Sequence, residues 1–574
     1  MNKIRPFILG LAVVLSAFLA YGLFTLPSPK GADHEGFSSA RVVKDIEVIS
    51  KEHHSVAHPV ERARVREYLV ERLRGLGADT VKLFEYDSLV GPKNKHVVYQ
   101  FDAVNVLAEF APQSSADSTA YLLFVAHYDS RYSQPMPKDT VWSYGAADDG
   151  YGVGVILETL AHALQQRSAW KQGVKVLFTD AEEVGMMGMS AMWERDRDVF
   201  DNVGLVINVE ARGPYGPALM FEACPGNAKV LELYADAAKY PYTYSLTTVV
   251  YKFMPNFTDF TIIKDELPGL NFSTIADVNH YHTDLDNFSN ISEKSIQHYG
   301  EQILPVAMAY LTSEEYADKD ALRADVDQTN FSVPALGLIS FSPTGYKVFC
   351  IVVFVLFLLM FALEGFRGRL KAMRVFKTTG ILLGSALGVL LLGEAYAWIC
   401  SAIVGAKFKL FGIVQGIPFD NAAMILFVVL VFSATMLVYW NSRSKAARSA
   451  SGSMRASAAF TAVSANALNL LYAALALLFV LSAALLFTIG ENMMFLIPLA
   501  LSTAAIALWR ATSVKSWLVI AVALILLHAF SFLYALSMAL TIGALGAVSM
   551  IAFLDFIVLI PLADLYCGIW RANR

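Results

Sequence analysis

The chain has 574 residues, which is enough for two or three domains. Hydrophobic residues make up 56% of it and charged residues only 17%, below the roughly 25% that is usual for a soluble domain. Its net charge of −5 gives no support to a nucleic-acid partner. Only one of its four cysteines, Cys224, lies in a polar region, so an internal disulfide is excluded there.

The composition divides the chain into three segments, which we predict to be separate structural units. Residues 1–30 contain an apolar run at 7–26, long enough to span a bilayer. Residues 31–342 are rich in charged side chains, whereas residues 343–574 are dominated by Leu, Ala, Val, Ile and Phe. We therefore expect an N-terminal anchor, a polar domain that folds in water, and a C-terminal membrane domain.

The N-terminal apolar run can be interpreted as a transmembrane anchor or as a cleaved signal peptide. It is longer than the apolar part of a usual signal peptide, and no clear small-x-small cleavage site follows it. We favour the anchor. Either interpretation leaves Lys3 and Arg5 in the cytosol and exports the polar domain that follows.

Apolar runs of strand length alternate with helical periodicity along the polar domain. This alternation predicts an α/β domain with a mixed, largely parallel sheet flanked by helices. In such sheets, ligands bind at the carboxyl ends of the strands. The predicted strands are residues 104–110, 120–126, 174–179 and 205–209, and the predicted helices are residues 60–76 and 152–166.

Five short segments of the polar domain combine His, Asp and Glu, and nearly all of them follow strand-like runs. For any one segment the ordinary interpretation is better: a solvated histidine, an Asp-Asp turn or helix cap, or a surface carboxylate. Their occurrence in one domain favours a shared site, because several buried carboxylates repel one another and need a cation. The residues concerned are His127, Asp129, Asp148, Asp149, Glu182, Glu183, Glu210, His280 and His282.

The mixture of histidines and carboxylates, without a cysteine, suits zinc or a related divalent metal. One carboxylate that bridges two ions would form a co-catalytic pair, which lowers the pKa of a shared water and polarises a scissile carbonyl. His280 and His282 compete for one ligand position, because both would face the same side of an extended segment.

The C-terminal segment contains about seven further apolar runs of span length. Basic residues cluster in alternate loops, at 367–377 after the first run and at 443–455 after the third, as the positive-inside rule requires. We therefore expect an integral multi-pass membrane protein with both termini inside and the polar domain outside the cytosol. A bacterial inner membrane is favoured over a eukaryotic endomembrane with a lumenal domain. The Asn-x-Ser/Thr triplets at Asn271 and Asn287 flank the expected site, where a glycan would be awkward.

A family resemblance follows from the ordered motifs His-x-Asp, Asp-Asp-x-x-Gly, Glu-Glu-x-Gly, Asn-x-Glu and Tyr-His-Thr. This set resembles the two-zinc aminopeptidase family, typified by bacterial secreted aminopeptidases and yeast aminopeptidase Y, over roughly residues 37–312. With the multi-span tail, the chain is most similar to the branch of endoplasmic-reticulum metallopeptidases and vacuolar membrane proteases. In the tail the resemblance is architectural only.

The resemblance implies two zinc ions per chain and a role for each matched residue. One zinc would have His127 and Glu210 as ligands, the other would have Glu183 and His282, and Asp148 would bridge both. Glu210 departs from the soluble members, which commonly have Asp at this position.

The remaining matched residues would act on a proton or on a ligand. Glu182 would be the general base, because its side chain diverges from that of its neighbour, the ligand Glu183. Asp129 would accept the ring N–H of His127 and so fix its tautomer. The Tyr-His-Thr context favours His282 over His280 as the ligand.

The function expected from these features is the release of N-terminal residues from peptides, at a membrane and without a nucleic-acid partner. Glutaminyl cyclases, which share this fold but use one zinc, are an alternative, although the presence of both His127 and Glu210 favours a two-metal hydrolase. Non-catalytic receptor or assembly proteins on the same fold are a third interpretation. A transporter is a fourth, with Glu394 and Asp555 as intramembrane candidates.

Overall fold

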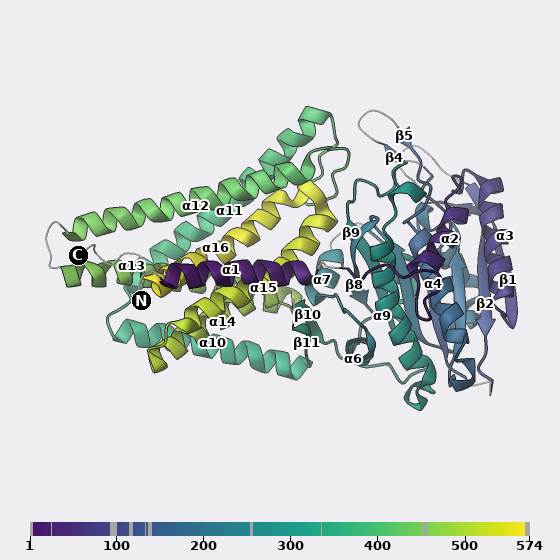
Figure 1. Cartoon of the computed structure of the whole chain (residues 1–574), viewed down its shortest axis with the longest axis horizontal. Coiled ribbons are helices and arrows are strands. Elements are labelled where there is room, and N and C mark those ends of the chain that lie inside the picture. Colours follow the sequence, from purple (N-terminus) through teal and green to yellow (C-terminus); the bar gives the residue numbers. More distant parts are fainter. Residues whose placement is uncertain are drawn as a thin grey trace. The chain divides into compact units, whose positions relative to one another are not determined.

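A computed structural model describes residues 4–23, 26–91, 100–113, 119–132, 134–135, 140–252, 256–333, 336–451 and 456–568. Within it the chain forms two compact units (Figure 1). The membrane unit comprises Met1–Leu23, Val333–Leu336 and Thr344–Arg574, and the polar unit comprises Phe24–Ser332 and Gly337–Pro343.

The membrane unit consists of long apolar helices. Seven segments of the described chain are long and apolar enough to span a membrane, and the last of them, Ser516–Cys567, contains two helices, α15 and α16. The eight predicted spans therefore correspond to eight helices, and the chain is an integral multi-pass membrane protein. These helices are α1 (Ile4–Leu23), α10 (Pro343–Phe366), α11 (Ala372–Val404), α12 (Asp420–Ser451), α13 (Ala456–Ile489), α14 (Met493–Thr512), α15 (Ser516–Leu540) and α16 (Leu545–Cys567).

The N-terminal helix α1 is part of this bundle. Its 20 residues give a length of about 30 Å, the thickness of a bilayer core. It packs along α15 (Figure 1), where the hydroxyl of Ser16 donates to the carbonyl of Ala523 at 3.2 Å. The N-terminal run therefore forms a helix of span length that packs against a C-terminal apolar helix.

The basic residues used to predict the orientation lie at the ends of these helices. Those at 367–377 lie between α10 and α11 and in the first turns of α11. Arg443, Lys445 and Arg448 lie in the last turns of α12, which continues to Ser451 beyond its apolar part. Lys3, Arg455, Arg571 and Arg574, which are also expected at the inner side, lie outside the described residues.

The polar unit is built on a seven-stranded mixed sheet with the order β1-β2-β6-β3-β7-β9-β8. The four strands β6, β3, β7 and β9 are mutually parallel, while β1, β2 and β8 join antiparallel at the two edges. The predicted fold class is thus confirmed. The strands are β1 (Thr80–Val90), β2 (Gln100–Phe110), β3 (Tyr121–His127), β6 (Gly173–Thr179), β7 (Val203–Ala211), β8 (Tyr215–Ala223) and β9 (Gly269–Ala276).

Two groups of helices cover this sheet. In the first group, helices α2, α4 and α9 pack on one another; α4 contacts β3 and β7, and α9 contacts β3 and β8. In the second group, α5 and α8 contact each other; α5 also contacts β2, and α8 contacts β3. The helices are α2 (Ser39–Ile49), α3 (Pro59–Gly75), α4 (Gly150–Leu164), α5 (Met187–Arg195), α6 (Ala228–Ala237), α7 (Ser245–Lys252), α8 (Asp259–Ile263) and α9 (Glu293–Thr312). Two short hairpins complete the unit, β4–β5 (Gln134–Pro135, Thr140–Val141) and β10–β11 (Thr329–Val333, Gly337–Phe341).

Strands β6 and β7 are buried along their whole length, which explains their largely apolar sequences. All the predicted strands and both predicted helices are present, with ends that differ by a few residues. Because β3, β6, β7 and β9 are parallel, their carboxyl ends meet at one edge of the sheet. Candidate ligands that follow these strands are therefore brought together.

Candidate metal centre

The candidate site lies at the carboxyl ends of the parallel strands. His127 is the last residue of β3, and Glu210 lies near the end of β7. Asp148 precedes α4, whose first turn is capped by the neighbouring Asp149 through the backbone N–H of Gly152 at 3.0 Å. The other two candidates, Glu183 and His282, follow β6 and β9; Glu183 is in the short 3-10 helix η2 (Glu182–Val184) and His282 is in a turn.

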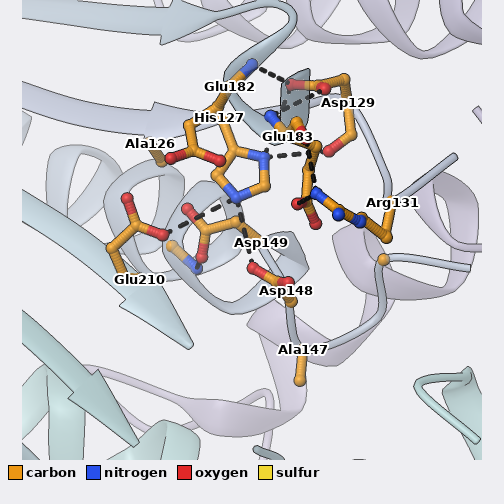
Figure 2. Close-up of polar contacts among 12 residues, drawn as sticks. Ala126, His127, Asp129, Arg131, Ala147, Asp148, Asp149, Glu182, Glu183 and Glu210 are labelled. Atoms are coloured by element: carbon orange, nitrogen blue, oxygen red, sulfur yellow. Dashed lines mark hydrogen bonds and ion pairs between the residues drawn. The ribbon is translucent and has the colours of Figure 1, made fainter. Parts of the chain in front are cut away.

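These residues form two groups that share one carboxylate. In the first, Nε2 of His127 lies 3.2 Å from Oδ1 of Asp148 and 3.6 Å from Oε2 of Glu210 (Figure 2). In the second, Nε2 of His282 lies 3.3 Å from Oδ2 of Asp148 and 3.1 Å from Oε2 of Glu183. Within each group the candidate ligand atoms lie within 4.8 Å of one another, as metal coordination requires. The two oxygens of Asp148 thus face two different groups.

The buried polar atoms of this site fit a cation. Oδ2 of Asp148, Oε1 of Glu183 and Nε2 of His282 are buried without a hydrogen-bond partner. Such atoms are costly in a folded protein unless a metal or water satisfies them. Their convergence, with two nitrogen and three carboxylate donors, is the donor set that zinc and related divalent ions bind.

The electrostatics of the carboxylates lead to the same conclusion. Burial raises the pKa of Glu210 to about 8, and repulsion from Asp148 adds to this rise. Burial also raises the pKa of Asp149 well above its usual range, again with repulsion from Glu210. Asp148 is the exception, because the neighbouring imidazole rings of His127 and His282 outweigh the effect of burial and lower its pKa. Without a cation, some of these closely spaced carboxylates would have to bind protons.

Asp129 connects two of the candidate segments. Nδ1 of His127 lies 2.9 Å from the carbonyl oxygen of Asp129 and 3.6 Å from its carboxylate, so the nearer acceptor for the ring N–H is the backbone. The carboxylate instead accepts the backbone N–H groups of Glu182 at 2.9 Å and Glu183 at 3.3 Å. The side chain of Asp129 therefore ties the end of β3 to η2.

Glu182 belongs to neither metal group. It lies in a tight turn in which Ala181, Gly185 and Met186 all have positive φ, and its carboxylate diverges from that of Glu183 (Figure 2). Burial raises its pKa well above the usual range, and repulsion from Glu210 adds to the shift. A half-buried carboxylate with raised proton affinity, beside a metal centre, can accept and return a proton.

His280, the competing candidate, points to a different partner. Its Nδ1 lies 3.3 Å from Oδ2 of Asp277, and its ring packs edge-on against Tyr215. Residues 277–286 form successive turns rather than an extended segment, and His282 has a φ of +61°. Side chains two positions apart therefore diverge, and only His282 reaches Asp148 and Glu183.

Several supporting residues have no role in the sequence prediction. Nη1 of Arg131 donates to the carbonyl of Glu183 at 2.6 Å and to its carboxylate at 3.2 Å (Figure 2). The ring of Tyr281 stacks on that of His282 with centroids 3.6 Å apart. Asp286 contacts the loop that carries Asp148. Tyr281 is the first residue of the Tyr-His-Thr motif, although that motif gave it no role of its own. Arg131 lies two positions after Asp129, but it belongs to no motif of the sequence analysis.

Comparison with known proteins gives a family for this part of the chain. Residues 105–307 match the model of "Peptidase family M28". Among curated proteins, endoplasmic reticulum metallopeptidase 1 of mouse is 29% identical over 229 residues, which are 39% of this chain and 24% of that protein. The vacuolar membrane protease of Yarrowia lipolytica is 28% identical over 231 residues, 39% of this chain and 22% of that protein. The matched region thus spans about a quarter of these relatives.

Solved structures similar to the polar unit include a zinc aminopeptidase from Bacillus subtilis, with 13% identity and a TM-score of 0.38, covering 51% of this chain and all of that one. A glutaminyl cyclase from Porphyromonas gingivalis has 20% identity and a TM-score of 0.37, covering 47% of this chain and 98% of that one. The family match includes His127, Asp148, Glu183, Glu210 and His282. Residues 105–307 of this integral membrane protein form a peptidase family M28 domain.

Proposed function

We propose that this protein is a membrane-bound aminopeptidase with two zinc ions, which releases N-terminal residues from peptides outside the cytosol. The observation that carries the proposal is the placement of Asp148, whose two oxygens lie 3.2 and 3.3 Å from histidines of two separate groups. A carboxylate placed in this way is suited to bridge two ions. The names of the curated relatives, a metallopeptidase and a protease of membranes, support the hydrolase class.

The proposed ligands are His127 and Glu210 for one ion, and Glu183 and His282 for the other, with Asp148 shared. Two divalent ions held there would lower the pKa of a water molecule and polarise the scissile carbonyl. Zinc suits the set because its ligands in hydrolases are commonly histidine and carboxylate with an open position for water.

Glu182 is proposed to handle the proton of the reaction. Its carboxylate takes a proton from the attacking water as the new C–O bond forms, and returns it to the leaving amine as the C–N bond breaks. The hydrogen bonds from the backbone of Glu182 and Glu183 to Asp129 hold the base and the neighbouring ligand in a fixed orientation. Removal of the buried carboxylate of Asp129 would loosen both.

The basic helix ends support the proposed orientation, in which the M28 domain faces away from the cytosol.

In a eukaryotic membrane this domain would meet the glycosylation machinery. The acceptor triplets at Asn271 and Asn330 are excluded in the folded protein, because both side chains are buried. Asn271 is in addition hydrogen-bonded to Glu222 and Thr258.

The proposal is tested on the full-length protein in detergent, by metal analysis together with a panel of aminoacyl substrates. We expect about two zinc-like ions per chain and release of N-terminal residues that stops when the metal is removed. A single tightly bound ion, with cyclisation of N-terminal glutamine and no peptide hydrolysis, would assign the protein to the cyclase class instead. A protein that binds metal without either activity would be a binding or assembly protein.

A further inference from the structure

Asp286 is a buried carboxylate with three donors, all on the loop that leads to Asp148. Its Oδ1 accepts the backbone N–H of Ala147 at 2.7 Å, and its Oδ2 accepts the hydroxyl of Ser143 at 2.8 Å. The backbone N–H of Asp148 itself lies 3.4 Å from Oδ2. Only 2% of Asp286 is exposed, so water does not compete for these bonds.

The same residue lies four positions after His282. Between the two, the turn is closed by a hydrogen bond from the backbone N–H of Asp286 to the carbonyl of Thr283 at 3.0 Å. Asp286 thus joins the loop of the shared ligand to the turn of the second histidine. The shortest of these hydrogen bonds joins Ala147 to Asp286, which are 139 positions apart in the chain. Neither residue belongs to a strand, so strand pairing alone does not fix the distance between their segments.

We propose that Asp286 is a positioning residue that sets the second metal position, the one formed by Asp148, Glu183 and His282. This inference rests on the proposed two-metal function. The carboxylate holds the backbone of Asp148 against the His282 turn, and the 3.3 Å separation between Nε2 of His282 and Oδ2 of Asp148 follows from that contact.

The two metal positions should depend on Asp286 to different degrees. In the first, His127 and Glu210 belong to the adjacent parallel strands β3 and β7, whose relative position is fixed by the sheet. In the second, His282 lies in a turn without strand pairing, and Glu183 lies in the separately anchored η2. Loss of the Asp286 contact would therefore allow His282 to move relative to Asp148. The relative position of His127 and Glu210 would still be fixed by the pairing of β3 and β7.

The test is the substitution Asp286→Asn in the full-length protein, with Asp284→Asn as the matched control. Asp284 is an exposed aspartate of the same turn, and its substitution makes the same change of charge. In Asp286→Asn an amide replaces one of the accepting oxygens, and its N–H groups would face the donors of the loop. The measurement is zinc bound per chain and the affinity of each ion, by titration against a competing chelator.

We expect the parent and Asp284→Asn to bind two ions with the same affinities. Asp286→Asn should bind the weaker ion about 10–100-fold less tightly, as is usual when a partner that orients a metal ligand is lost, and should keep the other ion within a few-fold of the parent. If Asp286→Asn does not fold, Ser143→Ala, which removes one donor and leaves the carboxylate, should weaken the same ion by a smaller factor.

Three outcomes would overturn the inference while leaving the two-metal proposal intact. The first is unchanged affinity for both ions in Asp286→Asn, and the second is an equal loss of affinity for both ions in that variant. The third applies if only Ser143→Ala folds, and is an unchanged affinity for both ions in Ser143→Ala. A parent protein that binds fewer than two ions would instead contradict the proposed function itself. A purely structural role would lower thermal stability without distinguishing the two ions, so the selective loss separates positioning from folding.

Discussion

Substitution of Glu182 by Gln tests the proposed base directly, because it removes basicity and preserves shape. The contact from this residue to Asp129 uses its backbone N–H, at 2.9 Å, and therefore survives the change. The side chain belongs to neither metal group, so the ligands His127, Asp148, Glu183, Glu210 and His282 are all retained. The expected loss is confined to proton transfer.

The magnitude follows from the role. Loss of a general base typically lowers turnover by about 10²–10⁴-fold, which corresponds to ~2.7–5.4 kcal/mol in the barrier. Metal content should stay near that of the parent, because none of the proposed ligands is changed. The assay compares kcat on an aminoacyl substrate with metal content, at equal folded yield.

The comparison variant is Glu183→Gln. Oε2 of Glu183 lies 3.1 Å from Nε2 of His282, and a neutral amide is a poorer ligand for a divalent cation, so this variant should lose metal as well as activity. If Glu182→Gln cleaves as fast as the parent, the assignment of the base is refuted. If Glu182→Gln loses metal to the same extent as Glu183→Gln, the proposed separation of base and ligand is wrong.

Three further predictions concern the ligand choice, the orientation and the fold. His282→Ala should lose one bound ion, whereas His280→Ala should keep two, as measured by metal analysis; equal losses would refute the choice between them. A reporter active only outside the cytosol should function when fused after Ser313 and fail after Arg448, and the opposite pattern would place the M28 domain in the cytosol. Arg62→Ala should lower the free energy of unfolding by about 3–5 kcal/mol, because it leaves the buried carboxylate of Asp180 without its ion pair at 3.0 Å; a loss below about 1 kcal/mol in denaturant titration would contradict this.

The part of the fold that the sequence predicts is the part that is buried on both faces. In β6 and β7 every residue is buried, so the strands have largely apolar sequences that are followed, or ended, by polar residues. Those polar residues include the candidate ligands Glu183 and Glu210 and the proposed base Glu182. Parallel pairing then brings the strand ends together, and a sequence pattern can therefore indicate both the sheet and one edge of the site.

Strand β9 shows why another part of the fold was not predicted. It is also fully buried, but its sequence includes Asn271, Ser273 and Thr274, so it lacks the apolar pattern of a central strand. The side chains of Asn271 and Thr274 are satisfied by partners distant in the chain. Nδ2 of Asn271 donates to Thr258 at 3.0 Å and to Glu222 at 3.2 Å. Such partners are defined only by the folded structure.

Glu210 illustrates how these unpredicted contacts support a predicted residue. A glutamate has one more rotatable bond than an aspartate, and its carboxylate needs a partner to hold a single orientation. Nδ2 of Asn208 supplies it, donating to Oε1 of Glu210 at 3.1 Å, and leaves Oε2 directed toward His127 at 3.6 Å. Asn208 precedes Glu210 by two positions in β7, so both side chains face the same side of the sheet.

Asn208 is itself held by the neighbouring strands. Its Nδ2 also donates to Oδ1 of Asn271 at 2.9 Å, across the register pair of β7 and β9. Asn271 donates in turn to Glu222, its register partner on β8, and Lys264 forms an ion pair with that carboxylate. The Asn-x-Glu motif is therefore one end of a buried polar row across three strands, and the orientation of a candidate metal ligand depends on residues with no metal-binding chemistry of their own.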